Sequence, residues 1–163
     1  MEHRRPIDIL LVEDNADHAT LTMRALRDGN MLNEIFWVKD GQEAVDFLER
    51  AGRYAAPAPP PPRPGLILLD IRLPKLDGHE VLRHIKSDPV LRSIPVVMLT
   101  TSERDDEITT CYEAGVNSYV SKPVKFADFV QTIKSLKLYW IMVNHLPDPT
   151  VPRPAMTAEP ATA

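Results

Sequence analysis

The chain has 163 residues, 44% of them hydrophobic, a size and composition that fit one globular domain able to bury a core without disulfides. Its net charge of -4 leaves no general basic surface for DNA or RNA, and its single cysteine excludes an internal disulfide. Because no apolar run reaches the length of a membrane span and the N-terminus leads straight into a short strand-like run, we expect a cytoplasmic protein that binds neither nucleic acid nor membrane.

The first predicted strand, residues 7–12, ends on two adjacent carboxylates, Glu13 and Asp14. Neighbouring carboxylates weaken each other's ionisation unless a cation or a strong hydrogen-bond donor lies between them, so the pair suggests a binding site. Helix capping is the simpler alternative, because Asp14 or Asn15 can accept amide hydrogens at the start of a helix predicted over about residues 16–28.

The next part of the chain indicates scaffold. Residues 35–38 are aromatic and β-branched and predict the second strand, after which Asp40 and Glu43 have the spacing of a capping box for a short helix. Residues 55–64 read AAPAPPPPRP, which favours exposed polyproline II. We interpret this insertion as a stiff surface connection, with a proline-rich recognition motif as the alternative.

The third predicted strand, residues 65–70, is an apolar run that ends on Asp70. An unbroken apolar run indicates a strand buried on both faces of a parallel sheet, and ligands bind such sheets at the carboxyl ends of their strands. Taken alone, Asp70 is as well explained as a turn residue before Pro74. Asp77 and Glu80 then predict a capped helix.

Two further strands complete the sheet. Residues 96–99 lead to Thr100, and residues 118–121 lead to Lys122. Five strands that alternate with helices predict an α/β fold with a doubly wound, five-stranded parallel sheet, whose strand ends share one edge. The polar residues expected at this edge are Glu13, Asp14, Asp70, Thr100 and Lys122.

These residue types suggest phosphoryl chemistry. Three carboxylates form an all-oxygen site of the kind that Mg²⁺ prefers. Lys122 and Thr100 offer a positive charge and a hydroxyl group that can hold phosphoryl oxygens. A carboxylate beside a metal ion can also attack phosphorus, so the edge predicts an aspartyl-phosphate acceptor at Asp70.

The last two helices differ in their apolar content. A helix predicted over residues 103–114 has only the narrow stripe Ile108, Cys111 and Tyr112, so we expect it to be weakly anchored. The final helix begins near Phe126 and has a full stripe at helical spacing. Its members are Phe129, Val130, Ile133, Leu136 and Trp140.

This set of residues resembles the receiver domain of two-component response regulators, of the CheY-like kind, over roughly residues 6–140. The motifs that carry the resemblance are Glu13-Asp14, Asp70, Asp77-Gly78, Thr100, Ala114-Gly115 and Lys122-Pro123. The run Thr100-Thr101-Ser102, the proline-rich insertion and Tyr139-Trp140 are similar to single-domain regulators paired with bacterial phytochromes.

The resemblance implies a flavodoxin-like (βα)5 fold with strand order 2-1-3-4-5. It implies that Asp70 takes a phosphoryl group from a phosphohistidine of a sensor histidine kinase, and the similarity to phytochrome-paired regulators implies a phytochrome as that kinase. Such a protein is a signalling module, and its own chemistry is limited to Mg²⁺-dependent phosphorylation and dephosphorylation of itself.

The resemblance also implies the metal ligands. Asp14, Asp70 and the backbone carbonyl of Arg72 would bind Mg²⁺ directly, while Glu13 would act largely through water. Lys122 would pair with the Asp70 carboxylate and then with the phosphoryl group.

Two residues match the family's switch. Thr100 would move to hydrogen-bond the phosphoryl oxygens, and Tyr119 would turn inward as Thr100 moves. The Lys122-Pro123 peptide bond would be cis.

Two departures from the family pattern concern the lifetime of the phosphoryl group. Arg72 replaces the small polar residue found in many receivers, and Thr101 is bulkier than the usual Ala or Gly. Both flank the expected path of the hydrolytic water, and we hypothesise that Arg72 changes the lifetime of the aspartyl phosphate.

Three alternatives compete with the receiver interpretation. A haloacid-dehalogenase-like phosphatase needs a second Asp where this chain has Arg72. A flavodoxin-like flavin binder needs a phosphate loop where Glu13-Asp14 would repel phosphate. A pseudo-receiver that takes no phosphate is disfavoured because the full acidic set is present.

The C-terminal part of the chain suggests self-association. Beyond Leu136 the residues are apolar on every face, more than one sheet face can cover, so we expect a homodimer rather than a kinase contact or an intramolecular one. The residues expected at the dimer surface are Tyr139, Trp140, Met142 and Val143. We assign residues 6–146 to the receiver domain and 147–163 to a proline-rich flexible tail that adds no DNA-binding or catalytic domain.

Overall fold

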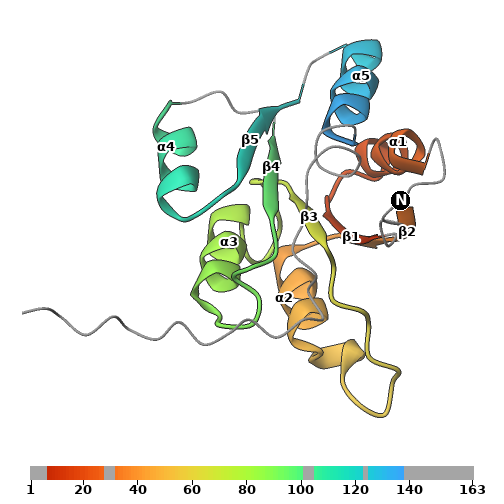
Figure 1. Cartoon of the computed structure of the whole chain (residues 1–163), viewed down its shortest axis with the longest axis vertical. Helices are drawn as coiled ribbons and strands as arrows, with labels where there is room; N and C mark the ends of the chain where they lie inside the picture. Colours follow the sequence, from red (N-terminus) through yellow and green to blue (C-terminus); the bar gives the residue numbers. More distant parts are fainter. Residues whose placement is uncertain (1–6, 28–31, 101–104, 123–124, 138–163) are drawn as a thin grey trace, which may run out of the picture.

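The computed structural model describes residues 7–27, 32–100, 105–122 and 125–137 (Figure 1). Its strands are β1 (Ile7–Val12), β2 (Leu32–Val38), β3 (Leu66–Leu69), β4 (Val96–Thr100) and β5 (Ser118–Ser121). Its helices are α1 (Ala16–Arg27), α2 (Gly41–Glu49), α3 (Gly78–Ser87), α4 (Asp105–Glu113) and α5 (Phe126–Lys137), with a short 3-10 helix η1 (Gly52–Tyr54) after α2.

The strands form one parallel sheet in the order β2-β1-β3-β4-β5. Strands and helices alternate along the chain, so a helix packed on one face of the sheet connects each strand to the next. This arrangement confirms the predicted CheY-like α/β fold and its strand order.

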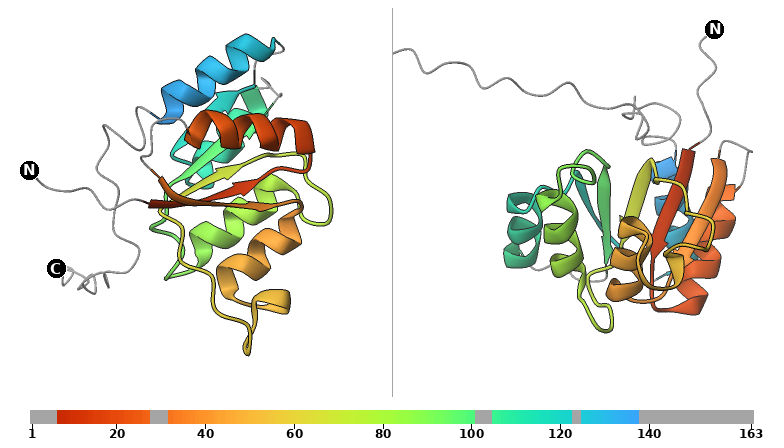
Figure 2. Two further views of the ribbon diagram at one scale, coloured as in Figure 1. Left: turned by 90° about the vertical axis from the view of Figure 1, so that its right-hand side faces the viewer. Right: turned by 90° about the horizontal axis from the view of Figure 1, so that it is seen from below.

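Helices cover both faces of the sheet, with α1 and α5 on one side and α2 and α3 on the other (Figure 2). Within β1, Ile9 and Leu11 belong to the core under α1 and α5, whereas Leu10 and Val12 belong to the core under α2 and α3. All four side chains are at most 1% exposed. Burial on both faces explains why the strand sequences are apolar without alternation.

The predicted starts of helices α2 and α3 are confirmed. The Asp40 side chain accepts a hydrogen bond from the Glu43 N–H at 2.7 Å and caps α2. At α3, Asp77 and Glu80 form the full capping box, each side chain bonding the other residue's backbone N–H. Both caps satisfy amide groups that the first helical turn leaves without partners.

Two expectations about individual elements were wrong. The second strand begins at Leu32, not at residue 35, because pairing with β1 continues back to Ile7. Tyr112 does not belong to the buried stripe of α4, since it is 52% exposed while Cys111 is fully buried. Successive residues point about 100° apart on a helix, so Tyr112 points away from the side on which Cys111 is buried.

The proline-rich residues 55–64 form neither helix nor strand. The Arg63 guanidinium donates a hydrogen bond to the Leu48 carbonyl, and the Gly65 N–H donates one to the Asp8 carbonyl at 2.8 Å. The insertion is therefore held against the fold where it returns to β3.

Several expectations fall on residues outside the described ranges. They concern Thr101, the cis bond at Pro123, Trp140 in the last helix, the surface of Tyr139, Trp140, Met142 and Val143, and the tail 147–163. Among the helices that the structure does describe, none combines the length and the apolarity needed to cross a bilayer.

Candidate functional site

The sheet register brings the two carboxylate-bearing strand ends together. Val12 of β1 pairs with Leu69 of β3, so the next residues, Glu13 and Asp70, leave adjacent strands at the same level. The Asp70 N–H also donates to the Val12 carbonyl at 3.1 Å. The side-chain oxygens thus start from neighbouring backbone positions.

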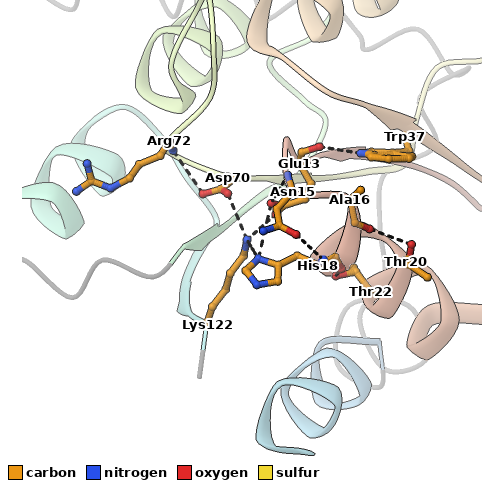
Figure 3. A network of polar contacts seen from close by, with 10 residues as sticks. All are labelled: Glu13, Asn15, Ala16, His18, Thr20, Thr22, Trp37, Asp70, Arg72 and Lys122. Carbon is orange, nitrogen blue, oxygen red and sulfur yellow. Dashed lines mark hydrogen bonds and ion pairs between the residues drawn. The ribbon is translucent and has the colours of Figure 1, made fainter. Parts of the chain in front are cut away.

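Lys122 follows β5, the edge strand that pairs with β4. Thr100 of β4 pairs with Ser121 of β5, and Lys122 follows directly, with its N–H donating to the Thr100 carbonyl at 2.6 Å. From this position the Lys122 side chain extends across the sheet edge toward Asp70 (Figure 3).

Three carboxylates form the predicted acidic cluster. Glu13, Asp14 and Asp70 offer oxygens that all lie within 4.8 Å of one another. Glu13 and Asp70 are buried, whereas Asp14 is exposed. Closely spaced hard oxygen ligands with one side open to solvent fit Mg²⁺, which keeps several of its waters.

Lys122 bridges the two buried carboxylates. Its Nζ lies 2.5 Å from Glu13 Oε2 and 3.2 Å from Asp70 Oδ2, and its side chain is only 3% exposed. A charge so deeply buried needs ionic partners, and the two carboxylates provide them. The contact with Asp70 was expected from the resemblance to receiver domains; the shorter contact with Glu13 was not.

Burial and charge oppose each other at this site. Burial raises the pKa of Glu13 from 4.5 to about 6, even though the hydrogen bond and charge of Lys122 act to lower it. Burial and the nearby Lys122 charge both lower the pKa of His18, whose imidazole is therefore mainly neutral at neutral pH.

Backbone and indole groups fix the loop after β1. Asn15 caps α1, because its Oδ1 accepts the His18 N–H at 3.0 Å, while its own N–H donates to Glu13 Oε1 at 3.2 Å. Trp37 of β2 donates its indole Nε1–H to the Glu13 carbonyl at 2.7 Å (Figure 3). The capping alternative is thus true of Asn15, and it leaves the Asp14 carboxylate exposed to solvent.

The loop after β3 is tied to Asp70 through its backbone. The Arg72 N–H faces Asp70 Oδ1 at 3.4 Å, and the exposed Arg72 guanidinium points away from Asp70 and Lys122 (Figure 3). Gly78 packs so closely on this loop that a Cβ would lie 2.2 Å from the Asp70 carbonyl oxygen. The backbone around Asp70 is therefore fixed by the start of α3.

The two expected switch residues lie on the neighbouring strands. Thr100 at the end of β4 is fully buried. Tyr119 of β5 is partly buried and packs against the core under α2 and α3. Their movement on phosphorylation stays a prediction.

Sequence reasoning missed two residues that contact the site. His18 Nδ1 lies 3.4 Å from Lys122 Nζ, and Trp37 holds the Glu13 carbonyl. His18 lies in the first turn of the helix that directly follows the acidic pair, a position that could have indicated its closeness to the site. No sequence signal pointed to Trp37, because its contact depends on the register between β1 and β2.

Comparison with known proteins decides the family. Residues 9–134 match the family described as the response regulator receiver domain. The chain belongs to this family. A receiver domain is a phosphoacceptor signalling module rather than a classical enzyme, and the acidic cluster of Glu13, Asp14 and Asp70 is consistent with the phosphoacceptor pocket of such a domain.

Two relatives show how far the sequence similarity extends. Over 152 residues the receiver is 45% identical to a probable methanogenesis regulatory protein, FilR2, of Methanothrix harundinacea, covering 91% of this chain and 93% of the relative. It is 39% identical over 146 residues to the response regulator Rcp1 of Synechocystis, with 90% and 97% covered.

Solved structures of two response regulators are also similar to this chain. The Mn²⁺-bound form of Rcp1 matches with a TM-score of 0.82, covering 88% of this chain and all of Rcp1. The phosphorylated cyanobacterial phytochrome response regulator RcpA matches with 41% identity, the same TM-score of 0.82 and the same coverage.

Proposed function

We propose that this receiver accepts a phosphoryl group on Asp70 from a sensor histidine kinase and passes the signal on by a change of conformation. One observation carries the proposal: the Asp70 carboxylate belongs to a cluster of oxygens suited to Mg²⁺ and also lies 3.2 Å from the Nζ of Lys122. A nucleophilic carboxylate can approach a negative phosphoryl group when positive charges lie beside it, and here Lys122 and a bound Mg²⁺ would provide them.

The transfer is an exchange of one bond for another. An Asp70 oxygen forms a bond to phosphorus while the bond from phosphorus to the donor imidazole nitrogen breaks. The electron pair of that bond stays on the departing nitrogen, and the ring leaves as a neutral imidazole because its other nitrogen carries a proton, taken up before or during the transfer. The Lys122 ammonium, which is within 3.2 Å of Asp70 Oδ2, would then hydrogen-bond a phosphoryl oxygen.

The proposed metal ligands are those that the resemblance to receiver domains implies, and three of the residues involved, Glu13, Asp14 and Asp70, lie close together in this chain. Asp14, Asp70 and the Arg72 carbonyl would hold Mg²⁺, with Glu13 acting largely through water. The bound ion supplies neutralisation of the negative charge on the transferred group. Rcp1, which binds Mn²⁺ in its solved form, supports a divalent cation here.

The proposed change of conformation on phosphorylation involves one residue of β4 and one of β5. Thr100 would move toward the phosphoryl oxygens, and Tyr119 would follow it into the space that Thr100 leaves. Both residues already lie on adjacent paired strands, since Met98 pairs with Tyr119 and Thr100 with Ser121.

The proposed kinase is a phytochrome, acting in the cytoplasm. The support is the similarity to RcpA, a phytochrome response regulator, and to Rcp1. A homodimer through the C-terminal helix and its extension is also proposed, on the apolar sequence after Leu136. Sedimentation of a chain shortened to Lys137 tests it, because a dimer that persists would contradict the proposal.

A phosphodonor assay tests the central claim without needing the kinase. The protein is incubated with Mg²⁺ and phosphoramidate, and a phosphate adduct is sought by intact mass spectrometry. We expect an adduct in the parent and in Asp17→Asn, a matched control at an exposed carboxylate in the first turn of α1. Asp70→Asn should show none, as should the parent with EDTA. An adduct that survives in Asp70→Asn would contradict the proposal.

A further inference from the structure

The Lys122 ammonium has a third neighbour besides the two carboxylates. His18 Nδ1 lies 3.4 Å from Lys122 Nζ, on the side of α1 (Figure 3). An ammonium group has three hydrogens to donate and cannot accept. Glu13, Asp70 and His18 thus provide one acceptor for each hydrogen.

The geometry fixes the tautomer of His18. Because Lys122 only donates, the Nδ1 atom facing it must carry a lone pair, and the neutral ring must bear its hydrogen on Nε2. His18 Nδ1 is 3.9 Å from the nearer Glu13 oxygen, beyond hydrogen-bond distance. The polar contact that orients the ring is therefore the one with Lys122.

Packing holds the imidazole where it is. The His18 ring lies against the Phe129 ring of α5, with centroids 5.7 Å apart, and Phe129 is only 4% exposed. The backbone N–H of His18 also donates a hydrogen bond to Asn15 Oδ1 at the start of α1. His18 thus connects Lys122 to two helices, α1 and α5, that cover one face of the sheet.

We propose that His18 is a positioning residue for Lys122, its Nδ1 accepting the third ammonium hydrogen and so directing the other two toward Glu13 and Asp70. This inference rests on the proposed phosphorylation of Asp70. When the phosphoryl group arrives, the contact with His18 keeps the ammonium from rotating away from the oxygens it has to meet. Without this acceptor, the ammonium samples more orientations and the transfer slows.

The contrasting possibility is that His18 only fills space against Phe129. Two substitutions separate the roles. His18→Phe keeps an aromatic ring on Phe129 and removes the acceptor, whereas His18→Gln replaces the ring by a side chain whose amide oxygen can accept from Lys122. A packing role predicts that Phe preserves function, and a positioning role predicts that Gln preserves it better.

The experiment measures the rate of Asp70 phosphorylation by phosphoramidate in Mg²⁺. We expect His18→Phe to be about three- to tenfold slower than the parent, the effect of losing one hydrogen bond, with Gln nearer the parent. Mg²⁺ affinity, measured separately, should stay within about twofold because His18 offers no metal ligand in this arrangement. Equal rates for the parent and His18→Phe would overturn the inference, and so would a Gln protein slower than the Phe protein.

A spectroscopic measurement keeps the test independent of phosphorylation. The ¹⁵N shifts of the His18 ring, assigned by their loss in His18→Phe, should show Nδ1 unprotonated and Nε2 protonated in the neutral ring. The opposite tautomer would overturn the inference, because an Nδ1–H cannot accept from Lys122. A parent that takes no phosphate would instead refute the proposed function, and the tautomer would still report on His18.

Discussion

The indole of Trp37 donates a hydrogen bond to the backbone carbonyl of Glu13 at 2.7 Å, joining β2 to the first residue of the acidic cluster. The Lys39 ammonium lies over the same ring, 5.1 Å from its centroid. Trp37 is therefore an internal probe of the site, since a cation among the carboxylates changes the field at the indole.

We predict that adding Mg²⁺ changes the fluorescence of Trp37. The chain has two tryptophans, so the titration is made in Trp140→Phe, which leaves Trp37 as the only one. The signal should saturate with Mg²⁺ and vanish in Asp14→Asn. A saturating signal that remains in Trp37→Phe and is absent from Trp140→Phe would contradict the assignment.

Replacing Lys122 by methionine should destabilise the metal-free protein by about 3 kcal/mol at neutral pH, because Glu13 and Asp70 then remain buried without their counter-charge. Mg²⁺ should restore part of the loss by supplying positive charge to the same carboxylates. Urea unfolding with EDTA or with Mg²⁺ measures both effects. Lys125→Met, at an exposed position, is the matched control, and equal losses in the two variants would rule this explanation out.

The raised pKa of Glu13 predicts a pH dependence of stability. Between pH 4.5 and about 6 the folded protein keeps the Glu13 proton that the unfolded chain has already lost. The free energy of unfolding should therefore fall by about 2 kcal/mol as the pH rises through this window, from its full value below pH 4.5.

Comparison with Glu13→Gln isolates this effect, because the other titrating groups are common to both proteins. Urea unfolding in EDTA between about pH 4 and pH 7 should show the fall in the parent and a flatter curve in the variant. The idea fails if the difference between the two curves does not change with pH.

Much of this architecture followed from the sequence, for identifiable reasons. Residues 7–12 and 118–121 are short runs that each end at a charged residue, Glu13 or Lys122, and both have the predicted limits as β1 and β5. The meeting of Asp70 with Glu13 could be expected because the carboxyl ends of parallel strands share an edge. These inferences need only the order of elements and the burial of the sheet.

The side-chain contacts within the site could not be derived from the order and burial of the elements. Whether Lys122 approaches Glu13 or Asp70 more closely depends on side-chain rotamers, and no spacing in the sequence records these. The contact of His18 with Phe129 joins α1 to α5, far apart in the chain, and the contact of Trp37 with Glu13 depends on the register between β1 and β2. Tyr112 was misassigned for a similar reason, since the neighbours of α4 decide which side of the helix is covered.

The Arg72 side chain gives a prediction about the lifetime of the phosphoryl group. Its backbone N–H faces Asp70 Oδ1 at 3.4 Å, a contact that substitution of the side chain leaves in place. In Arg72→Asn, the short amide can hold a water near Asp70, and we expect dephosphorylation to become several-fold faster. Decay of the adduct after removal of the phosphodonor measures this, and equal decay rates would end the hypothesis.

Gly78 offers a test of how strictly the backbone at Asp70 must be held. An alanine Cβ at this position would lie 2.2 Å from the Asp70 carbonyl oxygen and 2.6 Å from the Ile71 Cα, and neither backbone atom can move without shifting the loop. We expect Gly78→Ala to lose about 3 kcal/mol of stability and to slow phosphorylation of Asp70.

Gly65→Ala is the matched control, because its Cβ would meet the Ile7 side chain at 3.1 Å, and a side chain at the start of β1 can adjust. This variant should lose about 1 kcal/mol or less and keep the parent phosphorylation rate. Urea unfolding and phosphoramidate labelling of the two variants give the comparison. If Gly78→Ala labelled at the parent rate despite a large loss of stability, the glycine would serve folding alone, and the close packing of α3 on Asp70 would have no part in placing the carboxylate.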